Sequence, residues 1–114
     1  MDLNSQRFSR WSSEPSEVSG AAVIVQVKVN DRLLSYPQGK SAMVWYGVLA
    51  PCTASRVEML LEELADIMSG EQLVWRFLVS ESAESDLQQL LWRFEKRFGS
   101  APERMGRSLS ARLL

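Results

Sequence analysis

Valine at every second position of residues 23–29 is the feature that most constrains the fold. Successive side chains of an extended strand point to opposite faces, so this spacing predicts a strand with one fully apolar face. Gln26 and Lys28 fall on the other face, which we expect to be partly exposed to solvent. The valines of the apolar face are Val23, Val25, Val27 and Val29.

Two more strands are expected before the chain reaches residue 51. Asn30 and Asp31 both tolerate positive φ, so they favour a two-residue hairpin turn after the first strand. "RLLSY" would then form the returning strand. "PQGK" would form the next turn, with Pro37 fixing φ and Gly39 adding conformational freedom. The segment "SAMVWYGVLA" is nearly all apolar, which is typical of a central strand covered on both faces.

A helical spacing replaces the strand pattern after Pro51. Ser55 and Glu58 have the spacing of a capping box, which predicts a helix from about residue 55. Gly70 is the expected end of this helix, because glycine is common just beyond a helix C-terminus. The apolar stripe of the helix consists of Val57, Leu60, Leu61, Leu64 and Met68.

A fourth strand and a second helix complete the pattern. In "EQLVWRFLVS" alternate apolar side chains fall on one face. Ser85 and Gln88 repeat the capping-box spacing, and Gly99 is the expected end of the second helix. The apolar arc of this helix predicts that its two phenylalanines belong to the core. The residues of the arc are Leu87, Leu90, Leu91, Phe94 and Phe98.

This order of elements predicts an α+β fold. We expect a two-layer sandwich in which an antiparallel β-meander is followed by helix, strand and helix (βββαβα). Residues 1–20 are rich in serine and predict a flexible N-terminal arm, residues 21–99 form the α+β domain, and residues 100–114 form a basic C-terminal tail or a short helix. At 114 residues the chain is long enough for one such domain.

The absence of histidine excludes several kinds of chemistry. The commonest general base and the commonest metal ligand are both missing, and the single cysteine, Cys52, leaves neither a disulfide nor a Cys-His pair. Cys52 precedes a helix start, where a thiol can become reactive, although a small buried residue is the simpler explanation. We therefore expect a protein that is not an enzyme and holds no metal or cofactor.

Neither a membrane span nor a secretory signal is visible in the sequence. No apolar run approaches the roughly 20 residues that cross a bilayer. The N-terminus, "MDLNSQRFSRWSSEPSEVSG", lacks the apolar central segment of a signal peptide. These observations predict a cytoplasmic protein without a membrane partner.

Part of the pattern loosely resembles the ribonuclease H-like fold. The resemblance lies in the strand meander, in "ASRVEMLLEELADIM" and in "LVWRFLVSES" before the second helix, over about residues 21–95. In that family, acids on the first strand, the first helix and the fourth strand hold two metal ions. By position Glu58 and Glu81 match two of them, but the first strand carries Gln26 and Lys28 where the family has its essential Asp. The resemblance therefore implies a topology and not an activity.

Charge and exposed aromatic residues point to binding instead. Net charge is −6 over residues 53–91 and +4 over residues 92–114. Trp92 lies off the apolar arc, and an exposed tryptophan on a helix is a good anchor for a partner protein. We expect a protein–protein interaction module, an adaptor, regulator or inhibitor that also self-associates as a homo-oligomer. The expected contact residues are Trp92, Gln88, Gln89, Lys96 and Arg93, together with Phe8 and Trp11 of the arm.

Two alternatives remain open at this point. The basic C-terminal region would suit a nucleic-acid-binding accessory protein, although a pI near 5.5 is low for that class. Its contact residues would be Arg97, Arg104, Arg107 and Arg112. The second alternative is a metal-dependent hydrolase, since the solvated side of the first helix carries four carboxylates that suit Mg²⁺. These carboxylates belong to Glu58, Glu62, Glu63 and Asp66.

Overall fold

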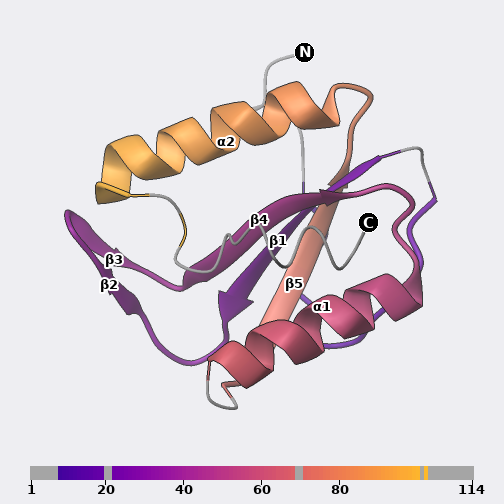
Figure 1. Cartoon of the computed structure of the whole chain (residues 1–114), viewed down its shortest axis with the longest axis horizontal. Coiled ribbons are helices and arrows are strands. Elements are labelled where there is room, and N and C mark those ends of the chain that lie inside the picture. The colour runs from indigo at the N-terminus through magenta and orange to yellow at the C-terminus, as the bar shows by residue number, and fades with distance from the viewer. Residues whose placement is uncertain (1–7, 20–21, 69–70, 101, 103–114) are drawn as a thin grey trace.

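The computed structural model confirms the α+β class. Its elements follow in the order β-β-β-β-α-β-α, with a three-stranded antiparallel sheet, a separate hairpin and two helices. Figure 1 shows the sheet between the two helices. The structure describes residues 8–19, 22–68, 71–100 and 102.

The valine-rich strand β1 (Val23–Val29) is the centre of the three-stranded sheet. It pairs antiparallel with β4 (Met43–Leu49) on one side and with β5 (Leu73–Val79) on the other. The hairpin turn expected at Asn30 and Asp31 is therefore wrong, because both edges of β1 are already occupied and leave no edge for the next strand.

The next two strands form their own small sheet. β2 (Leu34–Tyr36) and β3 (Gly39–Ser41) pair antiparallel around Pro37 and Gln38, which confirms the turn expected at "PQGK". The resemblance to the ribonuclease H-like fold is not supported, because it relies on a meander of consecutive strands. Here β1 instead pairs with the fourth and fifth strands.

Helix α1 (Ala54–Ile67) connects β4 to β5 and covers one face of the sheet. Thr53 is its N-cap and accepts a hydrogen bond from the Arg56 amide, so the cap lies two residues before the expected Ser55. The predicted stripe is confirmed, with Leu61 only half-buried. Its fully buried side chains include Val57, Leu60 and Leu64. Because β4 and β5 are both antiparallel to β1, they run parallel to each other, and α1 is the crossover between them.

Helix α2 (Ala83–Phe98) covers the opposite face (Figure 1). It ends as expected at Gly99, whose φ of 86° is the left-handed conformation that glycine adopts without steric cost. The start of α2 differs from the expected one, because the helix begins before the capping box predicted at Ser85. The Ser80 hydroxyl donates to the Asp86 carboxylate at 2.6 Å and accepts from the Ser82 amide at 3.1 Å, which fixes the entry into the helix.

The two faces of the sheet have different cores. The larger core lies under α1 and contains the four valines of β1 together with Trp45 and Trp75. The smaller one lies under α2, around Ile24 and Leu78. One helix therefore covers each face, whereas a two-layer sandwich would have both helices on one face.

Residues 8–19, where the sequence pattern predicts a flexible arm, pair with the outer edge of β5. Ser9 N–H donates to Phe77 O at 2.8 Å, and Ser12 exchanges two backbone hydrogen bonds with Trp75, each 2.9 Å. Further along, Val18 N–H donates to Cys52 O at 3.0 Å. This N-terminal segment therefore satisfies backbone groups of an edge strand that would otherwise face solvent.

Most of the expected C-terminal tail or helix at 100–114 lies outside the described residues. This applies to three of the four arginines expected to contact nucleic acid: Arg104, Arg107 and Arg112. Of the segment the structure describes Ser100 and Pro102, and Pro102 is buried.

Candidate interaction surface

Helix α2 presents a polar and aromatic face to solvent. Trp92 lies on this face, and 61% of its surface is exposed. Gln88, Gln89, Arg93 and Lys96 are exposed around it. We call these five residues the Trp92 surface. All five come from the sequence prediction, and the structure brings them together on one helix.

The opposite side of α2 is held in the protein by aromatic contacts. The Phe94 ring meets the rings of Tyr36 and Tyr46 edge-on, with centroids 5.1 and 5.6 Å away. Phe98 packs on Phe94 at 4.6 Å and on Tyr36 at 5.9 Å. The prediction that both phenylalanines face inward is confirmed, and it is their packing that turns Trp92 outward.

Two shallow hollows flank Trp92. One is lined by Trp92 with Ser85, Gln88 and Gln89. The other is lined by Gln38, Trp92, Glu95, Lys96 and Gly99, and its volume is about 420 Å³. The exposed indole therefore stands between two depressions that a partner side chain could fill.

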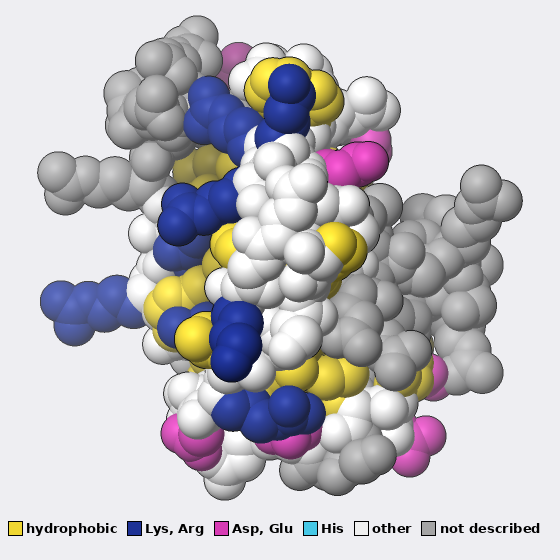
Figure 2. All heavy atoms as spheres, turned by 90° about the vertical axis from the view of Figure 1, so that its left-hand side faces the viewer, with side chains coloured by type: hydrophobic (Ala, Val, Ile, Leu, Met, Phe, Trp, Pro, Cys, Tyr) yellow, Lys and Arg dark blue, Asp and Glu magenta, His cyan; other side chains and the backbone are white. Residues whose placement is uncertain are grey.

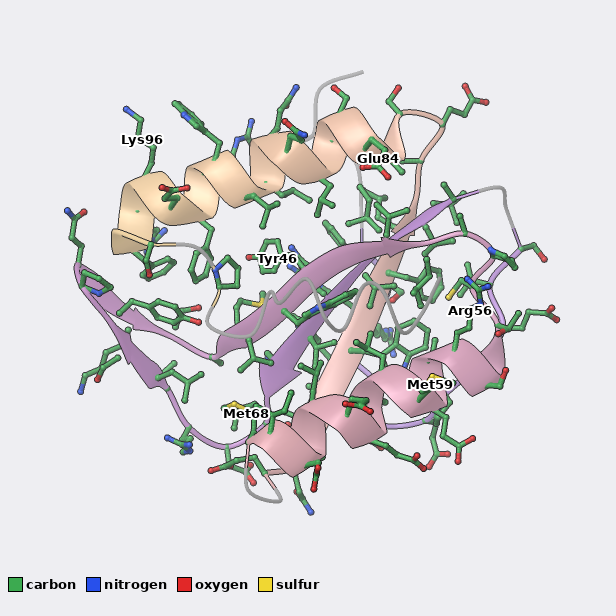
Figure 3. All side chains as sticks on the ribbon, in the orientation of Figure 1. Tyr46, Arg56, Met59, Met68, Glu84 and Lys96 are labelled. Carbon is green, nitrogen blue, oxygen red and sulfur yellow. The ribbon has the colours of Figure 1, made fainter. Side chains whose placement is uncertain are left out.

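The Lys96 ammonium lies over the Trp92 indole, 5.0 Å from the centre of the ring. Figure 3 shows Lys96 pointing away from the sheet. A cation over an indole face is attracted by the ring quadrupole. The pair therefore presents an apolar surface and a positive charge side by side.

Positive charge continues from α2 onto the β2–β3 hairpin. Gln38 N–H donates to Phe98 O at 2.9 Å, so the hairpin tip touches the end of the helix. Lys40, Lys96 and Arg97 are exposed at this end of the molecule. Figure 2 shows Lys and Arg side chains gathered in a column on this side. Sequence reasoning missed Lys40, because the hairpin and the helix end are far apart along the chain.

The outer face of α1 is acidic. Glu58, Glu62 and Asp66 are exposed there, with Met59 between them at 44% exposure. Glu63 is half-buried beside them. Among the described residues no three metal-ligating side chains come together in a group that would hold an ion. The α1 carboxylates that suggested a Mg²⁺ site therefore lie in a row along the helix and do not converge on one point.

Phe8 and Trp11, the expected contact residues of the N-terminal segment, interact within the chain. The Arg76 guanidinium lies 4.5 Å from the centre of each ring. Arg76 also donates from Nε to the Gln26 side-chain oxygen at 2.7 Å. Burial lowers the pKa of the Arg76 guanidinium, with the Tyr46 phenol acting in the opposite direction. Both rings are half-buried, so they stabilise the fold of this chain.

Two further titratable groups are buried. Burial raises the pKa of the Tyr46 phenol to about 12, although the Arg76 charge opposes the shift. Figure 3 shows Tyr46 on the side of the sheet that faces α2. Burial also raises the pKa of the Cys52 thiol, only partly offset by a backbone hydrogen bond from Val18. This shift makes Cys52 a poor nucleophile despite its position before α1.

Within the described part of the chain, no helix combines the length and the apolar character needed to cross a bilayer. In comparisons with known proteins, no family model matches the chain, and no curated protein or solved structure matches it.

Proposed function

We propose that this protein is a non-enzymatic interaction module that binds another protein through the Trp92 surface. The observation that carries the proposal is the 61% exposure of the Trp92 indole on a helix whose other side is packed. Burying an exposed tryptophan at an interface contributes a large share of binding free energy. The two hollows beside Trp92 could each accept a side chain of the partner.

The electrostatics agree with a protein partner of acidic character. Lys96 and Arg93 belong to the Trp92 surface, and Arg97 is exposed next to them. Such charges speed up the encounter with an oppositely charged surface and fix its orientation. A role as adaptor, regulator or inhibitor in the cytoplasm remains the proposal that fits these properties.

Replacement of Trp92 by Ala tests this function. A tagged chain is used to capture partners from its native host, with Leu33→Ala as the matched control. Leu33 is 59% exposed, but it lies in the loop before β2. We expect Trp92→Ala to weaken capture by about tenfold or more and Leu33→Ala to leave it unchanged.

Stability and fluorescence complete this test. The melting temperature of Trp92→Ala should match that of the wild type, because the side chain lies mostly in solvent. Trp45 and Trp75 are buried and Trp11 is half-buried, so a bound partner should shift tryptophan emission to shorter wavelength mainly through the exposed Trp92. Capture that survives the substitution, or a large drop in melting temperature, contradicts the proposal.

A second candidate function is nucleic-acid binding by the basic column of Figure 2. Lys40 of the hairpin and Lys96 of α2, which sequence reasoning did not connect, are both exposed at this end of the molecule. Contacts to phosphates release counterions, so the affinity for an oligonucleotide should fall steeply as salt is raised. No binding to DNA or RNA at low salt removes this candidate.

A further inference from the structure

The outer faces of the two helices are complementary to each other. On α1, Ser55, Met59, Glu62 and Asp66 lie on the side opposite the buried Val57 stripe. On α2, Ser85, Gln89, Trp92 and Lys96 form the corresponding outward row with the same spacing along the helix. We define the acidic face as Glu58, Met59, Glu62 and Asp66.

We propose that the acidic face of one copy docks on the Trp92 surface of a second copy. The proposal rests on the proposed function, because it names the occupant of the same surface. It commits to a second copy of this chain, since the chain itself provides a surface of the chemistry that the Trp92 surface requires.

The charges favour this contact. Three exposed carboxylates, those of Glu58, Glu62 and Asp66, would face the ammonium of Lys96 and the nearby Arg97 guanidinium. On α1 itself the carboxylates stand four residues apart, where like charges repel each other. Docking against cations would relieve that repulsion in one copy and neutralise the basic face in the other.

The apolar groups of the two faces also match. The Trp92 indole is 61% exposed, and Met59 is 44% exposed within the acidic face. A methionine thioether packs favourably against an aromatic ring, and its flexible side chain adapts to a shallow hollow. The interface would thus have an apolar centre with opposite charges around it.

The position of the helices determines the type of assembly. α1 and α2 cover opposite faces of the sheet (Figure 1), so one molecule can use both faces at once. The contact joins two different surfaces, which makes it heterologous and lets further copies add head to tail. The contact uses one helix from each copy, and interfaces below about 1,200 Å² are typically weak and transient. Assembly should therefore depend on protein concentration and on salt.

A charge-exchange experiment tests the proposal. One variant carries Lys96→Glu and Arg97→Glu, and the other carries Glu62→Lys and Asp66→Lys. Light scattering coupled to size exclusion measures the mass of each variant, of the wild type and of an equal mixture. Circular dichroism and melting temperature verify that each variant is folded. If a charge-reversed variant is not folded, the corresponding neutral substitution, Lys96→Gln or Glu62→Gln, is used in its place.

The expected result is that the wild type forms species larger than a monomer at low salt and dissociates at high salt. Each variant alone should be monomeric, because its two helix faces carry charges of the same sign. The mixture should recover larger species, because the acidic α2 of one variant meets the basic α1 of the other. Recovery on mixing is specific to the proposed pair of faces.

Three results would overturn the proposal. They are a wild type that is monomeric at every concentration and salt, variants that still assemble alone, and a mixture that stays monomeric. None of them contradicts the proposed function, which depends on whether Trp92→Ala weakens capture of a different protein. Conversely, capture that is insensitive to Trp92 removes the proposed function, whereas the docking of one copy on another is decided by the mixing experiment alone.

Discussion

Gly47 shows how one residue determines the packing under α1. The indole of Trp45, two residues earlier on the same face of β4, lies over this glycine and is 2% exposed. A Cβ built at residue 47 would come within 2.5 Å of Trp45 Cζ2. The Trp45 indole therefore fits in the core only because residue 47 has no side chain.

Gly47→Ala should destabilise the protein strongly, because the enclosed Trp45 ring has no space to retreat. Overpacking of this kind costs about 1–3 kcal/mol of unfolding free energy, which urea denaturation measures. The same substitution in a Trp45→Phe background is the control and should cost less, since the smaller ring leaves room. An equal cost in both backgrounds would show that the backbone at residue 47 is responsible.

Tyr46 makes stability depend on pH. Its pKa is about 12 in the folded protein, compared with 10.0 for a free tyrosine. Because the folded pKa is the higher one, the buried neutral phenol contributes fully below about pH 10, and this contribution is lost as pH rises toward 12. The loss is at most about 3 kcal/mol.

The Tyr46→Phe variant isolates this effect. Urea unfolding of both proteins at neutral and at strongly alkaline pH should show a smaller loss of stability in the variant, which has no phenol to ionise. Parallel losses in the two proteins would assign the alkaline destabilisation to other groups, such as the lysines or Tyr36.

At the scale of elements, helices and strands follow from local spacing, whereas their starts do not. The alternation of β1 and the apolar arc of α2 identify both elements, but β1 is buried on both faces, because Gln26, expected on a partly exposed face, is only 2% exposed. The capping boxes at Ser55 and Ser85 place both starts too late, because Thr53 caps α1 and the Ser80–Asp86 pair leads into α2. Several hydroxyl residues lie before each helix, and spacing alone does not distinguish them.

The amino-acid composition of the N-terminal segment does not indicate that it pairs with the sheet. Serine-rich sequence with few aliphatic residues predicts disorder, but backbone pairing with β5 does not depend on aliphatic side chains. What holds it is the Ser12–Trp75 bridge together with the Phe8 and Trp11 rings on Arg76. The charged and aromatic residues of "RFSRW" are the signal that could have indicated it.

Ser12→Pro tests the pairing. Proline has no N–H, so the bond to Trp75 O is lost, and we expect unfolding free energy to fall by about 1–3 kcal/mol. The Trp75 amide, which donates to Ser12 O, should also exchange its hydrogen faster. Ser12→Ala keeps the N–H and is the control with a small effect. Unchanged exchange at Trp75 in the proline variant would show that the segment does not depend on this pair.

At the scale of the whole molecule, the α+β class is predictable but the strand order is not. Local patterns reveal the elements, while the neighbours of β1 depend on long-range strand pairing and on the crossover through α1. The Trp92 surface was predictable because it lies on one helix. Its hollow beside Gln38 and the basic end with Lys40 depend on a hairpin brought there by tertiary packing.

The pairing of the N-terminal segment with β5 also orders events during synthesis. The Trp75 indole donates to the Glu14 backbone across a separation of 61 residues, so the first segment leaves the ribosome long before its partner exists. Contacts of such long range form late. Until β5 emerges, Phe8 and Trp11 lack the Arg76 guanidinium on which both rings pack in the folded protein.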